Sequence, residues 1–140
     1  MLRKYGLTTG LMIASFGLGI YVAHAPSVNA QHRKRVIEIR TYTTAEGKLD
    51  PLAKRMGTDE MQFFEKHGMD NVFYGVAADP PLAANTFVYI VAHESREAAK
   101  KSWAAVTGDP AFKDLISKTG RFSVKAESIM LNPTDYSPLK

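Results

Sequence analysis

The chain has 140 residues, 45% of them hydrophobic, and a formal net charge of +4 at neutral pH. This length suits one globular domain with a single core and argues against a second domain. The chain has no cysteine, which excludes disulfide bonds, thiol catalysis and cysteine-ligated metal.

The first thirty residues have the pattern of a secretory signal peptide. Arg3 and Lys4 precede an uncharged, mainly apolar run over about residues 7–23, and a stretch of small residues ends at Ala30. We predict cleavage after Ala30 and a periplasmic or secreted mature chain. Two alternatives remain: an uncleaved segment that anchors the protein in a membrane, and a mitochondrial presequence.

Positive charge is concentrated before the predicted domain. Five of the 18 Lys and Arg residues precede Val36, which leaves 13 of them against 14 Asp and Glu in residues 36–140. A nearly neutral domain lacks the basic face that nucleic acids require, so we predict no nucleic-acid partner. The segment 31–35, which contains "HRKR", is expected to be a basic, flexible, solvated arm in front of one domain at 36–140.

The predicted elements alternate along that domain. A strand at 35–43 is followed by a helix that starts at Asp50-Pro51 and ends at Gly68. The chain then shows a strand at 69–77, a Pro-rich loop, a strand at 86–94, a helix capped by Ser95, a short helix opened by Asp109-Pro110, and a strand at 121–131. This order predicts an α+β, ferredoxin-like βαββαβ domain with a four-stranded antiparallel sheet and helices on one face.

The first and third strands each have an aliphatic and a polar or aromatic face. We expect the helices to cover the aliphatic positions Ile37, Ile39, Val88, Ile90 and Ala92. The other face is too aromatic for exposure and too polar for a dry core. We therefore predict a homodimer, a dimeric α+β barrel, whose two sheets enclose a polar cavity formed by Glu38, Arg40, Tyr42, Phe87, Tyr89, Val91 and His93.

Five segments in order resemble a NIPSNAP domain: "VIEIRTYTTAEGKLDPL", "FFEKHG", "FVYIVAHES", "SWAAVTGDPAF" and "LNPTDYSPL". The resemblance runs from about Val36 to the C-terminus and implies the dimeric α+β-barrel superfamily. Animal members are mitochondrial and linked to membrane trafficking and mitophagy signalling, whereas short relatives with an export signal lack an agreed activity. The wider superfamily includes cofactor-independent monooxygenases, haem-degrading enzymes and small-molecule isomerases or dehydratases, so the resemblance implies a ligand without identifying it.

Glu38, Arg40 and His93 are the candidate catalytic residues. Glu38 and Arg40 project from one face of the strand, where Arg40 could bind an anionic group while Glu38 or His93 acts as a base. The alternatives are an ion pair in the dimer contact and, for His93, a partly exposed strand end. Candidate ligand-binding residues, equally suited to an interface, are Tyr42, Tyr74, Phe87 and Tyr89.

Standard catalytic signatures are missing from the sequence, including a phosphate loop, a nucleophile elbow and a dinucleotide fingerprint. We predict no cofactor and no metal; local spacing does not require Glu38, His67 and His93 to form a metal site. Trp103 is expected in the core. The preferred function is an exported NIPSNAP-type homodimer that binds a small organic ligand and could perform cofactor-independent acid/base chemistry. The alternative is a non-enzymatic interaction module whose barrel is only a dimer core.

Overall fold

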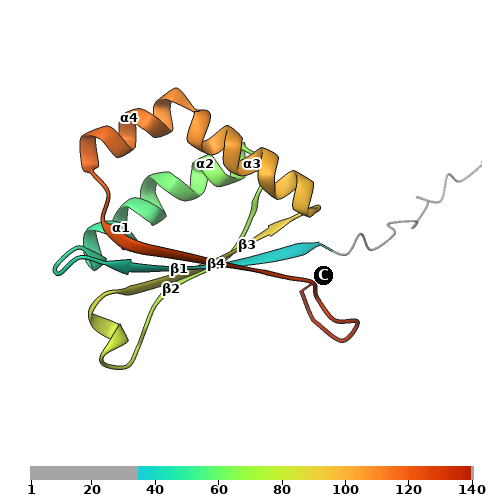
Figure 1. Ribbon diagram of the computed structural model, residues 1–140, viewed down its shortest axis with the longest axis horizontal. Coiled ribbons are helices and arrows are strands. Elements are labelled where there is room, and N and C mark those ends of the chain that lie inside the picture. Colours follow the sequence, from blue (N-terminus) through green and yellow to red (C-terminus); the bar gives the residue numbers. More distant parts are fainter. Residues whose placement is uncertain (1–34, 140) are drawn as a thin grey trace, which may run out of the picture. The chain divides into compact units, whose positions relative to one another are not determined.

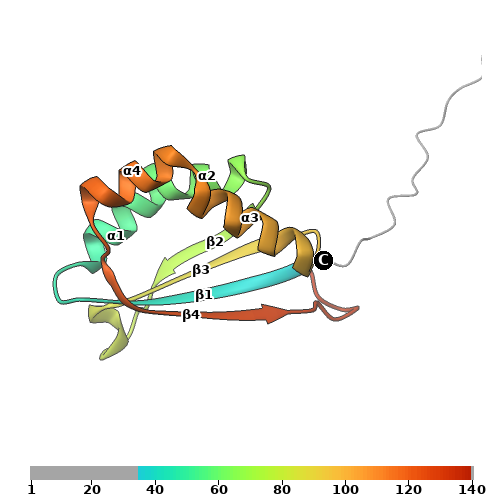
Figure 2. The same ribbon diagram turned by 45° about the horizontal axis from the view of Figure 1, so that its top comes forward.

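The computed structural model describes residues 35–139. They form a four-stranded antiparallel sheet with helices packed on one of its faces (Figure 1; Figure 2). The predicted signal peptide and residues 31–34 of the predicted arm lie outside the described residues. Within residues 35–139, none of the helices combines the length and the apolar character that a membrane span requires.

The order of elements confirms the predicted ferredoxin-like fold. The strands are arranged β2-β3-β1-β4 and all pairings are antiparallel. The elements are β1 (Val36–Thr44), α1 (Leu49–Arg55), the π-helical turn η1 (Met56–Glu60), α2 (Met61–Lys66), β2 (Asp70–Val76), the 3₁₀ turn η2 (Leu82–Ala84), β3 (Thr86–His93), α3 (Arg96–Gly108), α4 (Pro110–Thr119) and β4 (Ser123–Leu131).

Two of the predicted helix starts are confirmed and one is wrong. The side chain of Ser95 accepts a hydrogen bond from the backbone N–H of Ala98 at 3.0 Å, and Asp109 caps α4 through the N–H of Ala111 at 2.9 Å. Asp50, however, lies inside the first turn of α1, which begins at Leu49 without a side-chain cap. The predicted single regular helix is also interrupted, because η1 inserts a wider turn between α1 and α2.

The two faces of the sheet are the reverse of the sequence prediction. Glu38, Arg40 and Tyr42 lie in register with Val91, Tyr89 and Phe87, and these β3 side chains pack under the helices in the hydrophobic core. The predicted polar cavity between two sheets is therefore wrong. The polar side chains are enclosed within one chain, by its own helices.

Side-chain volume and hydrogen bonding explain this reversal. The Tyr89 ring stacks with Phe64, at 5.7 Å between ring centroids, and with Tyr74, at 5.6 Å. Aromatic rings of this size fill the space between sheet and helices, which aliphatic strand residues would leave partly empty. A carboxylate is tolerated there because its hydrogen-bonding capacity is satisfied, as described below.

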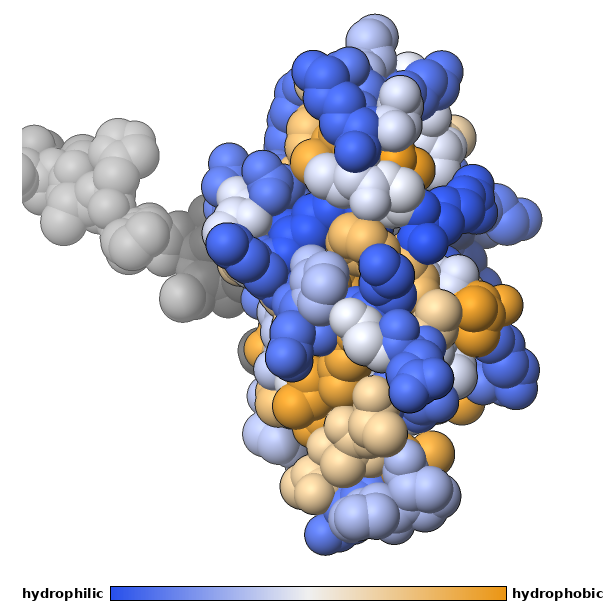
Figure 3. Space-filling model, turned by 90° about the vertical axis from the view of Figure 1, so that its left-hand side faces the viewer, coloured by the Kyte–Doolittle hydropathy of each residue, from blue (hydrophilic) through white to orange (hydrophobic). Residues whose placement is uncertain are grey.

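An exposed apolar row crosses the sheet face opposite the helices, whereas Ile37 and Ala92 on the same face are buried and Lys125 and Glu127 form an ion pair there. Ile39 and Ile90 lie side by side in this row, and Phe73 and Ile129 are 51% and 59% exposed. In Figure 3, hydrophobic surface gathers in the lower half of the view, away from the helices at the top. An exposed apolar row of this kind on a small domain indicates an interaction surface.

Replacing Phe64 tests the aromatic core. Phe64 is 1% exposed, so Phe64→Ala should lower the free energy of unfolding by about 3–5 kcal/mol. The matched control Tyr136→Ala removes a ring that is 88% exposed and should change stability by less than about 0.5 kcal/mol. Urea unfolding followed by circular dichroism measures both variants. Equal effects of the two substitutions would contradict the described core.

Candidate functional site

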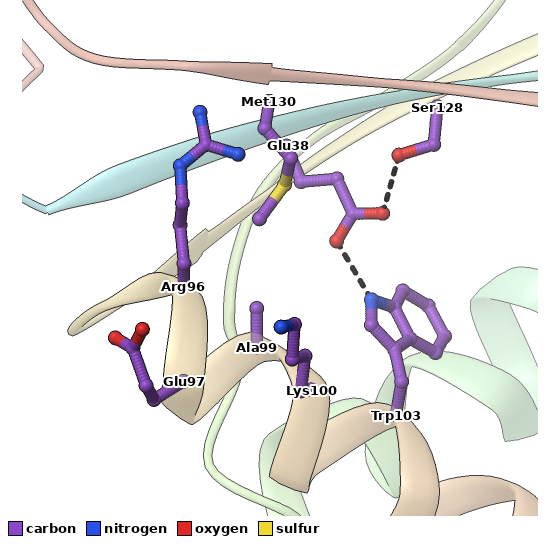
Figure 4. Close-up of a pocket in the computed structure, with 8 residues that line it drawn as sticks. All are labelled: Glu38, Arg96, Glu97, Ala99, Lys100, Trp103, Ser128 and Met130. Carbon is purple, nitrogen blue, oxygen red and sulfur yellow. Dashed lines mark hydrogen bonds between the residues drawn. The ribbon is translucent and has the colours of Figure 1, made fainter.

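Glu38 is the hub of the polar network beneath the helices. Its side chain, in a residue only 3% exposed, accepts four hydrogen bonds. The donors are His93 Nε2 at 2.9 Å, Trp103 Nε1 at 2.7 Å, Ser128 Oγ at 2.7 Å and Arg40 Nη1 at 3.0 Å. They come from β3, α3, β4 and β1, so one carboxylate joins three strands to a helix. Figure 4 shows the bonds from Ser128 and Trp103.

This environment makes Glu38 a strong acid. Burial by itself would raise its pKa, but the hydrogen bonds from His93, Ser128 and Trp103 and the charge of Arg40 outweigh burial and lower the pKa from 4.5 to about 2. A carboxylate with such a low pKa is a weak base, and its oxygens are already engaged. The geometry therefore suits a positioning role for Glu38 better than the catalytic base expected from the sequence.

His93 is buried, so it is not the partly exposed strand end considered as an alternative. Its Nε2 contacts the ionised Glu38 and must carry a hydrogen, which leaves Nδ1 without a hydrogen-bond partner among the described residues. His67 instead contacts Asp109, at 2.8 Å between Nε2 and Oδ2. The trio of Glu38, His67 and His93 does not assemble, and residues 35–139 contain no cluster of three His, Asp or Glu side chains suited to a metal ion.

Arg40 is held in place but retains unused donors. Its guanidinium carbon lies 4.3 Å from the centre of the Trp103 ring, and Nη1 donates to Glu38. Burial would lower the pKa of Arg40, but Tyr89, Tyr42 and Glu38 outweigh this and raise it, so the group stays charged. Its Nε is buried without a hydrogen-bond partner in the described part of the chain. Such an arginine is ready to bind an anionic group.

Arg40 lines a cavity of about 240 Å³ between the sheet and the helices. This volume is below the range of about 300–1,000 Å³ typical of pockets for drug-sized ligands, and suits a compound of one ring. The cavity has aromatic walls formed by Tyr42, Phe64, Trp103, Phe112 and Phe122.

A second, more open cleft of about 550 Å³ lies on the other side of Trp103. Figure 4 shows Arg96 and Lys100 of α3 and Met130 of β4 around it, with Glu38 at its base. The indole of Trp103 therefore separates two compartments. The sequence pattern predicts Trp103 in the core and does not indicate this role, because the role depends on how α3 lies over the sheet.

The helix wall of the cavity carries a buried ion pair that the sequence did not predict. Arg55 Nε donates to Glu60 Oε1 at 2.6 Å, and Arg55 Nη1 donates to Thr119 Oγ1 and to the carbonyl of Gly120. Residues five apart point in different directions in a regular α-helix with 3.6 residues per turn. The wider turn of η1 brings Arg55 and Glu60 together. Nothing in the sequence pattern signals that turn.

Only one of the four predicted ligand-binding residues lines the cavity. Tyr42 does so, and its hydroxyl is hydrogen-bonded to that of Tyr89 at 2.9 Å. Tyr89 is fully buried behind it, and burial is the main reason that its pKa is raised. Tyr74 and Phe87 pack against Tyr89 and support the cavity from behind.

The NIPSNAP family model matches residues 37–138. The chain belongs to the NIPSNAP family. The chain is similar to a NIPSNAP family protein with unknown function from Agrobacterium tumefaciens, known from a crystal structure. The two sequences are 25% identical, the TM-score is 0.69, and the alignment covers 78% of this chain and 96% of the other chain. The search of curated proteins gives no match.

Two more distant structures share the fold. The cofactor-independent oxygenase SnoaB from Streptomyces nogalater has 14% identity, a TM-score of 0.52, and coverage of 75% of this chain and 98% of its own. The monooxygenase ActVA-Orf6 of Streptomyces coelicolor, in complex with nanaomycin D, has 11% sequence identity and a TM-score of 0.51. The alignment covers 76% of this chain and 93% of the monooxygenase chain. At these identities the similarity establishes the fold of this NIPSNAP domain and not its activity.

Glu38→Gln tests the hub through the pH dependence of stability. The substitution should lower the free energy of unfolding at neutral pH by about 1.5–3 kcal/mol, because hydrogen bonds to a charged acceptor are lost. The pKa of Glu38 is lower in the folded protein than in the unfolded chain. Its contribution to the free energy of unfolding is therefore fully present above the ordinary pKa of a glutamate and is lost as the pH falls towards about 2. Urea unfolding of both proteins across this range should show the difference shrinking. A difference that stays constant down to about pH 2 would contradict the described network.

Proposed function

We propose that this NIPSNAP domain binds a small aromatic anion in the cavity between its sheet and helices. One observation carries the proposal: Arg40 is a charged side chain, is fixed by Glu38 and Trp103, and lines the cavity. A guanidinium held at the wall of a cavity favours an anionic group as its partner, because hydrogen bonds between charged groups are strong.

The composition of the walls supports an aromatic ligand. Phe64 and Phe112 come from the helices, Trp103 lies beside Arg40, and Phe122 closes the region before β4. Ring faces and edges favour a flat, apolar body, while the guanidinium favours a negative group at one end of it. The cavity thus combines Arg40, which is held by Glu38 and Trp103, with several aromatic walls, and Arg55 and Arg121 add positive charge to its lining.

The distant oxygenases support small-molecule binding on this fold. ActVA-Orf6 is in complex with the ligand nanaomycin D, and SnoaB is a cofactor-independent oxygenase. For the present chain we propose that binding of a small molecule is the primary function. Any reaction of that molecule would be carried out by side chains without a cofactor. We also retain, as a proposal, export of the mature chain by the N-terminal segment.

A second proposal concerns the apolar outer face of the sheet. We propose that two copies pack through this face, which would cover Phe73 and Ile129 and the side chains around Ile39 and Ile90. The non-enzymatic alternative, a module whose barrel is only a dimer core, draws its support from this face. The two proposals are compatible because the cavity lies on the opposite side of the sheet.

The binding proposal is tested with benzoate as the probe. Trp103 is the chain's single tryptophan and lines the cavity, so its fluorescence reports on occupancy. Benzoate should change the emission saturably, and Arg40→Met should weaken binding by roughly tenfold to a hundredfold through loss of a charged hydrogen bond. Arg35→Met removes an arginine from a surface ion pair with Asp70 and serves as the control with unchanged affinity. Absence of saturable binding to the wild type would contradict the proposal.

The dimer proposal is tested with a charge on the outer face. Ile129→Lys should convert the dimer to a monomer. Burying an unpaired lysine against apolar side chains costs on the order of several kcal/mol. Ala104→Lys, on an exposed part of α3, should leave the dimer intact. Size-exclusion chromatography with light scattering measures both. A monomeric wild type at micromolar concentration would refute the proposal.

A further inference from the structure

Glu60 occupies a place in the cavity that no feature of the sequence suggested. It lies on η1, in the helix wall, whereas Arg40 projects from the sheet wall. Glu60 is buried, and Oε1 accepts the hydrogen bond from Arg55. Among the described residues no donor reaches Oε2. One carboxylate oxygen is therefore fixed, and the other is left to a ligand in the cavity that Glu60 lines.

The charges around Glu60 set it apart from Glu38. Burial raises the pKa of Glu60; Arg55 opposes this incompletely, and Asp59 adds to it, so the pKa is raised overall. The remaining ionisable groups near Glu60 or along the cavity walls are Tyr74 of β2, Tyr89 of β3, Arg40 and Tyr42 of β1, and Arg121 before β4. A carboxylate with a raised pKa accepts a proton more readily than Glu38 does, and two carboxylates tuned apart indicate an acid/base division of roles.

We propose that Glu60 accepts a proton from the bound ligand, and that the cavity therefore takes aromatic compounds with a weakly acidic O–H group. In this step the O–H bond of the ligand breaks and the proton moves to the free oxygen of Glu60. The negative charge moves from the carboxylate to the ligand oxygen, where Arg40 balances it. This inference rests on the proposed binding function and assigns Glu60, rather than Glu38, as the base.

The geometry supports each part of this step. Arg55 holds Glu60 from the side of α1 and is itself anchored by Thr119 and Gly120 at the end of α4, so the carboxylate keeps its place when its charge is lost. The aromatic side chains in the walls lower the local dielectric constant, which strengthens the attraction between Arg40 and a newly formed anion.

The probe for this inference is meta-nitrophenol, which is mainly un-ionised in neutral buffer and whose phenolate absorbs at longer wavelength. Calorimetry measures binding, and difference absorbance measures ionisation of the bound probe. We expect the wild type to bind the probe and to show a phenolate band. Calorimetry in buffers of different ionisation enthalpy also counts the protons released to solvent. In the wild type the proton stays on Glu60, so almost no proton should be released per phenolate formed. Glu60→Gln keeps the shape but has no carboxylate to take the proton, so each phenolate that it binds should release about one.

Control variants separate this inference from the binding proposal. Benzoate is already an anion, so Glu60→Gln should bind it no more weakly than the wild type does. Glu65→Gln, on an exposed position of α2, should leave the phenolate band unchanged. If Glu60→Gln fails to fold, Glu60→Asp keeps a carboxylate and should release as few protons per phenolate as the wild type does. The proton count of the wild type tests the inference even without a variant.

The outcomes are distinct. Binding of meta-nitrophenol to the wild type without a phenolate band, or with about one proton released to the buffer per phenolate formed, would overturn the role of Glu60 and leave the binding proposal intact. Failure of the wild type to bind either benzoate or meta-nitrophenol would overturn the binding proposal itself. A phenolate band without proton release in the wild type, with proton release in Glu60→Gln and benzoate binding retained there, is the result that the inference predicts.

Discussion

The structure depends on the burial of one carboxylate beneath the helices. Four hydrogen bonds compensate Glu38 for the loss of water, and each comes from a different element. Because its donors belong to β1, β3, β4 and α3, the carboxylate fixes how α3 lies over the sheet. The position of Trp103, and with it the division between the two compartments, follows from that contact.

The same carboxylate determines what the neighbouring cavity can do. By keeping its own charge, Glu38 keeps Arg40 in a fixed orientation and leaves the remaining guanidinium donors for a ligand. The hydrogen bonds that Glu38 accepts lower its pKa to about 2, so that its carboxylate is a poor proton acceptor. Glu60, with one oxygen fixed and burial opposing its charge, has the complementary properties. The domain thus contains one carboxylate whose two oxygens are both hydrogen-bonded and another that keeps one free oxygen, which is why we propose Glu60 as the base.

Much of this fold could be predicted from local sequence patterns, whereas the orientation of the sheet could not. The strand periods, the caps at Ser95 and Asp109 and the order of elements depend on short-range rules, and these predictions are confirmed. The alternation of side chains along a strand defines two faces, but it does not determine which face the helices cover. Assigning the aliphatic face to the helices ignored the volume of the rings of Phe64 and Tyr89 and the satisfaction of Glu38 by distant donors.

The candidate site shows the same limit. Glu38, Arg40 and His93 were grouped correctly on one face because residues two apart on a strand share it, and cross-strand register brings His93 alongside. The ion pair of Arg55 and Glu60 could not be predicted from the sequence, because it requires a π-helical turn. Trp103 was expected in the core because an indole at helical spacing is usually packed there, and its bond to Glu38 spans 65 positions of the sequence.

The most direct test of the central claim is the indole N–H signal of Trp103 in a proton–nitrogen correlation spectrum, where the chain's one tryptophan gives one indole peak. A hydrogen bond to a buried, ionised Glu38 predicts a peak that exchanges slowly with solvent, changes markedly in Glu38→Gln and shifts when benzoate is added. An indole proton that exchanges as fast as that of free tryptophan and responds to neither change would contradict the account.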